Sequence, residues 1–314
     1  MTKNKYLIFS GSSNLPLAKK IVGRLKKDLG VANLGTFSDG EIRFQSWENV
    51  RGADVFIIQS FTKDINFHIM ELLLMCDAFK RASARRITAV IPYYAYARQD
   101  RKDRPRVPIS AKLIADLLET SGFSRILAID LHANQIQGFF NIPVDNLMGL
   151  PIFVSHFKKM KLKDLVIVSP DAGGVERARI FSQKLKAGLA IADKRRAEAN
   201  VAEIMHIIGD VKGKNTIIVD DIVDTAGTMT ETAKALKKNG AKKIYAACTH
   251  GILSGKALER ITDSPLEKVF ITDTIPLQGD LKKSEKIGML SVSDLFSQAI
   301  SSINKETSVS KLFK

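Results

Sequence analysis

Short, almost wholly apolar runs alternate with helical patterns along the chain. The runs are rich in β-branched residues, which predicts strands buried on both faces; they span 6–9, 53–60, 86–92, 125–131, 165–170, 215–221, 243–250 and 268–274. Between them, apolar residues recur every three or four positions at 15–29, 68–82, 109–122 and 228–240, which predicts amphipathic helices. Strands alternating with helices indicate parallel sheets covered on both faces. The predicted fold class is therefore α/β.

Two of these sheets are expected. The segment 145–153 (DNLMGLPIF) places Gly and Pro between two strand–helix units, and 314 residues exceed the usual size of one domain. We therefore expect two similar doubly wound parallel-sheet domains, an N-terminal one over 1–148 and a C-terminal one over 149–314. The last amphipathic stretch, 292–303, could pack on either domain, and packing back on the N-terminal domain is the expectation.

Composition is that of a soluble globular protein, with 45% apolar and 26% charged residues. No apolar stretch approaches the roughly 18 residues of a membrane span, and the short apolar run near the N-terminus predicts a first strand rather than a signal peptide. Cys76 and Cys248 each lie in an apolar run, so buried thiols are expected instead of a disulfide or a zinc site. A cytoplasmic protein without membrane association is expected.

The formal net charge of +15 suits anionic partners. The densest region, 80–106, carries nine basic residues and two acidic ones. Composition alone does not separate nucleic acid from small phosphates. No helix-turn-helix and no aromatic–basic platform is evident, so small phosphorylated ligands are favoured and nucleic acid is not expected.

The sharpest local pattern is NTIIVDDIVDTAGT, residues 215–228. It predicts a buried strand, two carboxylates at the strand's carboxyl end, a loop of small residues and a helix start. Backbone N–H groups of such a loop can surround a phosphate, and Asp220 and Asp221 can accept hydrogen bonds from sugar hydroxyls or hold a metal. The alternative is an ordinary acidic loop that caps a helix. The segment 209–215 (GDVKGKN) only superficially resembles a P-loop, because its first glycine is misplaced and Asn215 stands where Ser or Thr belongs.

The form DDIVDTAGT resembles the phosphoribosyl-pyrophosphate loop of type I phosphoribosyltransferase-like proteins. The resemblance implies that fold for both domains. It also implies that Asp220, Asp221 and Asp224 face a ribose, and that its 5-phosphate is bound by the loop residues Thr225, Ala226, Gly227 and Thr228.

Other segments place polar residues after predicted strands. The loop 96–106 (YARQDRKDRPR) could hold a triphosphate or be a solvated basic loop, and the turn 37–41 (FSDGE) could contact a base or be merely a Gly turn. His132 could be structural or could contact a metal or phosphate. Asp171, before two glycines and a helix, could be a ligand or an N-cap, and 192–200 (ADKRRAEAN) could be a solvated loop.

In order, FSDGE, YARQDRKD, DLHANQIQGFF, SPDAGG, DKRR and DDIVDTAGT resemble the phosphate-activated class of the ribose-phosphate pyrophosphokinase family over essentially the whole chain. The resemblance implies synthesis of phosphoribosyl pyrophosphate and AMP from ribose 5-phosphate and ATP with Mg²⁺. It implies that ATP is bound by Phe37, Asp39, Glu41, Arg98, Gln99 and Asp103. It implies that the metal is held by His132 and Asp171. It implies that charge on the transferred group is stabilised by Lys194 and Arg196.

The same resemblance implies a homo-oligomer, a hexamer built from dimers, with inorganic phosphate as activator and ADP as inhibitor. The implied regulatory positions are Arg51, Ser83, Arg106, Ser308 and Ser310. For the last two, a frayed terminus is the alternative. The loops 98–107 and 194–202 are expected to close over substrate.

Two rival functions remain open from sequence. A phosphoribosyltransferase would consume the sugar diphosphate instead of making it, and would not need the motifs of the first half. A non-catalytic regulator, such as a synthetase-associated subunit or a nucleotide-responsive DNA-binding protein, would keep the sugar-phosphate loop without turnover.

Overall fold

The computed structural model describes residues 5–195 and 204–313 and divides into two compact units. Unit 1 comprises Met1–Met148, Thr274–Pro276 and Ser291–Lys314, and unit 2 comprises Gly149–Asp273 and Leu277–Leu290. The chain thus leaves unit 1 between Met148 and Gly149, and its last segment belongs to unit 1 again. Only Met148 and Gly149 separate the strand and the helix that flank this point, so no long linker joins the units.

Unit 1 is built on a five-stranded parallel sheet in the order β1-β4-β5-β6-β7. Its strands are β1 (Tyr6–Ser10), β4 (Asp54–Ile58), β5 (Arg86–Ile91), β6 (Arg125–Ile129) and β7 (Val144–Leu147). Every residue of β4 is buried, as expected for a strand covered on both faces. A separate antiparallel hairpin is formed by β2 (Ala32–Thr36) and β3 (Ile42–Ser46).

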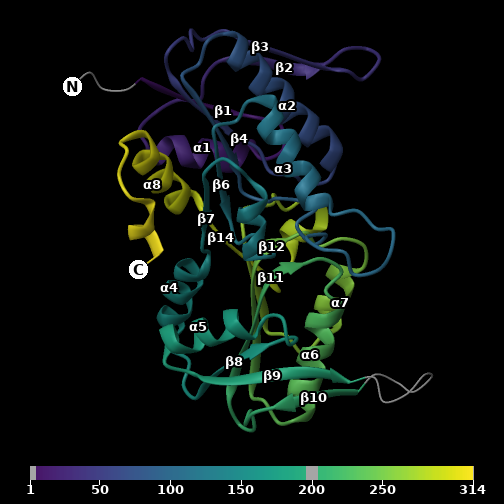
Figure 1. The fold of residues 1–314 in the computed structure, drawn as a ribbon. Helices are drawn as coiled ribbons and strands as arrows, with labels where there is room; N and C mark the ends of the chain where they lie inside the picture. The colour runs from purple at the N-terminus through teal and green to yellow at the C-terminus, as the bar shows by residue number, and fades with distance from the viewer. Residues whose placement is uncertain (1–4, 196–203, 314) are drawn as a thin grey trace. The chain divides into compact units, whose positions relative to one another are not determined.

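Helices lie on both faces of this sheet (Figure 1). One pair of packed helices is α1 (Leu15–Arg24) and α8 (Ser293–Asn304); the other is α2 (Ile65–Arg81) and α3 (Ser110–Ser121). Gly122 adopts a left-handed conformation (φ +119°) directly after α3, a position at which glycine is favoured as a helix C-cap. Short 3₁₀ helices follow at η1 (Asn134–Phe139) and η3 (Val309–Phe313). The last described residues, Val309–Phe313, therefore form a 3₁₀ helix.

Unit 2 contains a seven-stranded sheet in the order β10-β9-β8-β11-β12-β13-β14, parallel except for the edge strand β10. Its strands are β8 (Leu165–Ser169), β9 (Gly188–Arg195), β10 (Ile204–Ile208), β11 (Asn215–Val223), β12 (Lys243–Gly251), β13 (Lys268–Thr272) and β14 (Ile287–Leu290). Packed helix pairs are α4 (Leu150–Met160) with α5 (Val175–Leu185), and α6 (Gly227–Lys238) with α7 (Ala257–Asp263). A 3₁₀ helix, η2 (Gly279–Lys283), precedes β14.

The α/β prediction is confirmed, and each of the eight predicted strands is present. The strands that the sequence pattern missed are β2, β3, β7, β9, β10 and β14. Five of these belong to a two-stranded hairpin or form a sheet edge, where a strand is buried on one side only and its apolar signal is weak. The segment 145–153, where the sequence predicts the domain boundary, contains the end of β7 and the start of α4, and the first division between the units falls inside it, between Met148 and Gly149.

Cys76 and Cys248 are buried free thiols, as predicted. Burial raises the pKa of Cys76 to about 12, so this thiol stays protonated. Among the described residues, no helix combines the length and apolar character needed to cross a bilayer.

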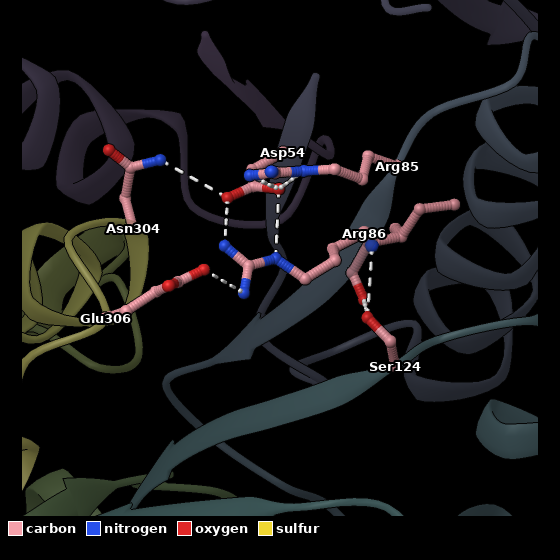
Figure 2. A network of polar contacts seen from close by, with 7 residues as sticks. Asp54, Arg85, Arg86, Ser124, Asn304 and Glu306 are labelled. Carbon is pink, nitrogen blue, oxygen red and sulfur yellow. Dashed lines mark hydrogen bonds and ion pairs between the residues drawn. The ribbon is translucent and has the colours of Figure 1, made fainter. Parts of the chain in front are cut away.

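A buried ion-pair network lies where β4 and β5 of unit 1 begin (Figure 2). The Asp54 side chain is only 3% exposed and accepts hydrogen bonds from Arg85 at 2.9 Å and from Arg86 at 2.5 Å. Asn304 at the end of α8 also donates to Asp54, and Glu306 accepts from Arg86. The network therefore joins the amino ends of two strands to the segment that follows α8. We name these five residues the Asp54 network.

Candidate active site

The most chemically suggestive segment of unit 2 is the turn that joins β11 to α6. β11 lies between β8 and β12, and the side chains from Thr216 to Val219 are buried. Its pairing with β8 stops at Ile218, whereas its pairing with β12 continues to Val223. The strand therefore runs beyond the predicted end at 221, and the two acidic residues lie on a stretch that is paired with β12 but not with β8.

Asp220 and Asp221 are held by one arginine from α5. Arg177 Nη1 lies 3.0 Å from Asp220 Oδ1, and Arg177 Nη2 lies 3.0 Å from Asp221 Oδ1. The backbone N–H of Asp221 also donates to Asp220 Oδ1 at 2.9 Å. The exposed fractions of the two carboxylate side chains are 26% and 4%. Two consecutive carboxylates thus contact one guanidinium, although neighbouring side chains of a regular strand point to opposite faces.

This arrangement has more negative than positive charge. Burial raises the pKa of Asp220, the Asp221 carboxylate raises it further, and Arg177 lowers it, with a net pKa of about 7. Because the two acids interact strongly, the proton belongs to the pair. Near neutral pH, hydroxyl donors or a cation would displace that proton and favour two ionised carboxylates.

The loop after these acids is fixed by a neighbouring turn and by α7. Ser254 donates to Asp224 through both its hydroxyl and its backbone N–H, the latter at 3.0 Å. Arg260 Nη1 donates to the carbonyl oxygen of Thr225 at 2.9 Å. Ala226 adopts φ +60°, a left-handed conformation that non-glycine residues seldom take, immediately before α6 begins. The loop is therefore held in one shape.

Gly227 is the first residue of α6. A Cβ added there would meet Arg260 Nη1 at 3.7 Å and Thr225 Oγ1 at 3.8 Å, which are ordinary contacts. Packing within the protein therefore does not demand glycine at this position. A ligand that approaches the backbone closely would require glycine here. The start of a helix is suited to binding an anion.

Asp171 lies in the equivalent place after β8. It is exposed, and its Oδ1 accepts from the backbone N–H of Gly174 at 2.8 Å, just before α5. One carboxylate oxygen thus stabilises the turn before α5, but Asp171 is not the N-cap of this helix, because Gly174 occupies that position. Arg177 belongs to the first turn of α5, so this helix connects the Asp171 turn to the acidic pair of β11.

In unit 1, the turn 37–41 is the tip of the β2–β3 hairpin. Phe37 is half exposed, its ring lies 5.7 Å from the Arg43 guanidinium, and Asp39 accepts from the backbone N–H of Glu41 at 3.0 Å. Gly40 has φ +95°, which satisfies the Gly-turn reading. That reading does not explain why an aromatic ring is left exposed at the tip.

The basic loop lies between β5 and α3, as its sequence predicts. Arg98, Asp103 and Arg106 are exposed. Gln99 is exposed too, but its side-chain oxygen accepts from the hydroxyl of Ser110 at the start of α3. His132 is exposed after β6. The loop and His132 belong to unit 1, whereas Asp171 belongs to unit 2.

Two predicted catalytic positions fall in or beside the undescribed part of the chain. The backbone of Lys194 belongs to β9, opposite Met205 of β10, so 192–195 is strand rather than loop. Arg196 lies outside the described residues, as does most of the loop 194–202 that is expected to close.

The predicted regulatory positions are exposed. The backbone N–H of Gly52, next to Arg51, donates to the carbonyl oxygen of Ser83 at 2.9 Å. The hydroxyls of Ser308 and Ser310 lie 2.6 Å apart. Arg106 belongs to the basic loop and has φ +63°.

The fit of a divalent metal can be judged from the available donors. The described residues contain no group of three or more His, Cys, Asp or Glu side chains placed to hold one ion. Mg²⁺ commonly takes one or two protein carboxylates together with waters and substrate phosphates. Asp171, Asp220 and Asp221 offer such oxygen donors, whereas the imidazole of His132 is a donor that Mg²⁺ does not favour.

Sequence reasoning missed three residues that shape this site: Arg177, Ser254 and Arg260. Arg177 stands within SPDAGGVERAR, but nothing in the pattern says that it reaches the acids 43 residues later. Ser254 and Arg260 are separated by 30 and 35 residues from their partners and carry no local signal.

Comparisons with known proteins agree with this geometry. Residues 6–122 match the model of the N-terminal domain of ribose phosphate pyrophosphokinase, and residues 196–314 match that of a phosphoribosyl synthetase-associated domain. The ribose-phosphate pyrophosphokinase of Caldanaerobacter subterraneus subsp. tengcongensis is 57% identical over 99% of this chain and 98% of its own. The Bacillus subtilis enzyme of the same name is 54% identical over 98% and 96%.

A solved structure is similar over nearly the whole chain. The phosphoribosylpyrophosphate synthetase from Mycobacterium smegmatis has a TM-score of 0.92 and 38% identity, covering 96% of this chain and 100% of that one. Because the match spans both units at high identity, the chain belongs to the ribose-phosphate pyrophosphokinase family.

Proposed function

We propose that this chain transfers the β,γ-diphosphoryl group of ATP to the C1 hydroxyl of ribose 5-phosphate, forming 5-phosphoribosyl 1-diphosphate and AMP. The C1 oxygen forms a bond to the β-phosphorus, the bond from that phosphorus to the α-bridging oxygen breaks, and the hydroxyl proton is released. The observation that carries the proposal is the acidic pair and small-residue loop of β11–α6, held by Arg177, Ser254 and Arg260, in a chain of this family.

In the proposed sugar-phosphate site, Asp220, Asp221 and Asp224 accept hydrogen bonds from ribose hydroxyls. The loop from Thr225 to Thr228 surrounds the 5-phosphate with backbone N–H groups and hydroxyls. Support comes from the excess of carboxylates over guanidinium at the acidic pair, the hydrogen-bonded loop and the absence, among the described residues, of any close contact at Gly227. Arg177 keeps both carboxylates on one side of the strand.

ATP is proposed to bind to unit 1. Phe37, Asp39 and Glu41 would contact the base and ribose from the hairpin tip, where the exposed ring is available for stacking. Arg98 would neutralise phosphate charge, and Gln99 and Asp103 would contact the nucleotide. Phosphoryl transfer asks a protein for positioning and charge neutralisation more than for covalent help.

When bound, Mg²⁺ would neutralise charge on the triphosphate as it develops. Asp171 would hold it through one carboxylate oxygen while the other keeps the turn before α5. His132 would contact phosphate rather than metal, because Mg²⁺ prefers oxygen donors. Lys194 and Arg196 are proposed to stabilise negative charge on the transferred group.

Regulation and assembly are proposed from the same family resemblance. Inorganic phosphate would activate the enzyme at exposed positions including Arg51, Ser83, Arg106, Ser308 and Ser310. The chain would assemble as a hexamer built from dimers. A phosphate-dependent rate that is lost in Arg51→Ala would support this assignment, and full phosphate activation of that variant would remove it.

No observation favours the rival functions. The relatives matched over both halves of the chain are ribose-phosphate pyrophosphokinases. A phosphoribosyltransferase would not account for the motifs in the first half. Asp171 and the acidic pair are intact, unlike the degenerate motifs expected of a regulator without turnover.

The test is the formation of AMP from ATP and ribose 5-phosphate with Mg²⁺, followed over a range of inorganic phosphate. Stoichiometric AMP and 5-phosphoribosyl 1-diphosphate are expected. Consumption of added 5-phosphoribosyl 1-diphosphate with a purine base, and no AMP from ATP, would establish the phosphoribosyltransferase instead. No turnover in either assay would favour the regulator.

A further inference from the structure

We propose that Arg177 is the positioning residue that makes the Asp220–Asp221 pair a receptor for ribose hydroxyls; this inference rests on the proposed function. The guanidinium belongs to α5, outside the β11–α6 turn, and forms one 3.0 Å contact to each carboxylate. No part of the local sequence around the acids supplies this contact.

The first step of the argument is geometric. Consecutive residues of a strand direct their side chains to opposite faces, so two adjacent carboxylates do not ordinarily point to one place. The planar fork of an arginine has two donor nitrogens at a fixed spacing, and here each reaches a different carboxylate. Arg177 therefore fixes the side-chain direction of both acids relative to α5.

The second step is electrostatic. Two neighbouring carboxylates, one of them only 4% exposed, repel each other. A guanidinium is always charged, so it favours their ionised forms across the working range of pH. One cation leaves a net negative charge on the cluster, which suits the acceptance of hydrogen bonds from a polyol.

The third step concerns the neighbouring turn. Arg177 lies in the first turn of α5, and the residue before this helix donates to Asp171. The same short helix start thus holds the acidic pair and carries the Asp171 turn. A change at Arg177 should alter sugar binding first, without altering contacts made by residues of unit 1.

The experiment compares Arg177→Met, which removes charge at similar length, with Arg177→Lys, which keeps charge but loses the fork. The matched control is Arg179→Met, an exposed arginine on the same helix. For each purified variant, kcat and KM for ribose 5-phosphate and for ATP are measured from acidic to alkaline pH.

For Arg177→Met we expect KM for ribose 5-phosphate to rise about tenfold or more, and the acidic limb of kcat/KM for that substrate to move up by about one pH unit. KM for ATP should change less than twofold. In Arg177→Lys the acidic limb of kcat/KM should return to its wild-type position, whereas KM for ribose 5-phosphate should stay raised. Arg179→Met should match the wild type in both quantities.

A purely structural role would lower the melting temperature of Arg177→Met while leaving the limb and KM for ribose 5-phosphate unchanged, and that result overturns the proposal. If Arg177→Met does not fold, Arg177→Lys decides, because unchanged KM in that variant also overturns it. Absence of wild-type turnover would refute the proposed function. If the wild type is active and the Arg177 substitutions leave KM for ribose 5-phosphate unchanged, this inference alone is refuted.

Discussion

Two arginine–carboxylate clusters, one in each unit, use the same chemistry in opposite proportions. In the Asp54 network, one buried carboxylate is contacted by two guanidiniums. In the cluster of β11, two carboxylates are contacted by one guanidinium. Burial alone would raise the pKa of Asp54, but the hydrogen bonds from Arg86 and Arg85 outweigh it and lower this pKa below its usual value. The pKa of Asp220 moves the other way, to about 7.

The ratio of charges explains what each cluster does. Asp54 has surplus donors, begins β4 and joins that strand to the segment after α8, so it stabilises the fold (Figure 2). Asp220 and Asp221 share the guanidinium of Arg177 and lie near the carboxyl end of β11, the edge at which parallel sheets bind ligands. Two guanidiniums around one buried carboxylate suit a structural role, whereas two carboxylates around one guanidinium carry an excess of negative charge that suits hydrogen-bond donors of a ligand.

The largest expected effect comes from removing the carboxylates of the β11 cluster. Replacing both acids together, Asp220→Asn with Asp221→Asn, should lower kcat/KM for ribose 5-phosphate at least about a hundredfold, because the charge that orients the sugar is lost. AMP formation measures this, with circular dichroism to verify folding. Turnover within a few-fold of wild type would contradict the role of the acidic pair.

The next largest effect is on stability and concerns the Asp54 network. Asp54→Asn leaves two arginines without their buried counter-charge and should cost about 2–3 kcal/mol in the free energy of unfolding, less than a fully buried pair because both arginines are about one-third exposed. Urea denaturation measures it. KM for ribose 5-phosphate should stay the same, and a change in KM rather than stability would reverse the comparison.

The two clusters should have opposite effects on the pH dependence of stability. The stabilisation from Asp54 is present above its unfolded pKa and lost as pH falls through its lowered folded pKa. Asp220 binds its proton more tightly when folded, so its contribution declines as pH rises from about 4 to about 7.

Asp220→Asn should therefore be more stable than wild type at about pH 8, by about 2 kcal/mol, and this advantage should shrink at about pH 5. Urea unfolding midpoints at both pH values measure the difference. An advantage that is equal at the two pH values would show that Asp220 titrates normally.

A smaller effect separates ligand binding from packing at the helix start. Gly227→Ala meets only ordinary contacts, so stability should remain the same or rise by about 0.5 kcal/mol. KM for ribose 5-phosphate should nevertheless rise about tenfold if the added methyl obstructs the 5-phosphate. An unchanged KM would mean that the phosphate lies elsewhere.

The smallest effect tests the exposed rim of the Asp54 network. Glu306 is 64% exposed and contacts Arg86 at 3.3 Å, so Glu306→Gln should change the free energy of unfolding by less than about 0.5 kcal/mol. Thermal unfolding at low and high salt measures it. A loss comparable to that of Asp54→Asn would show that the network is not centred on Asp54.

Sequence alone predicted the interior strands, because β4, β8 and β11 are buried on both faces and consist of apolar runs. It missed the edge strands β7, β10 and β14, whose residues alternate or are few. In the site, the acids and the loop were predicted from adjacent residues. The contacts from Arg177, Ser254 and Arg260 were not, because each joins segments 30 or more residues apart that only the folded chain brings together.

The most direct test of the account is the binding of ribose 5-phosphate itself, titrated calorimetrically with Mg²⁺ into wild type, Asp54→Asn and the doubly substituted acidic pair. We predict that wild type and Asp54→Asn bind the sugar phosphate with the same affinity, and that the variant lacking both Asp220 and Asp221 carboxylates binds at least about tenfold more weakly. Equal affinity in all three proteins would contradict the assignment of the sugar site to the turn after β11.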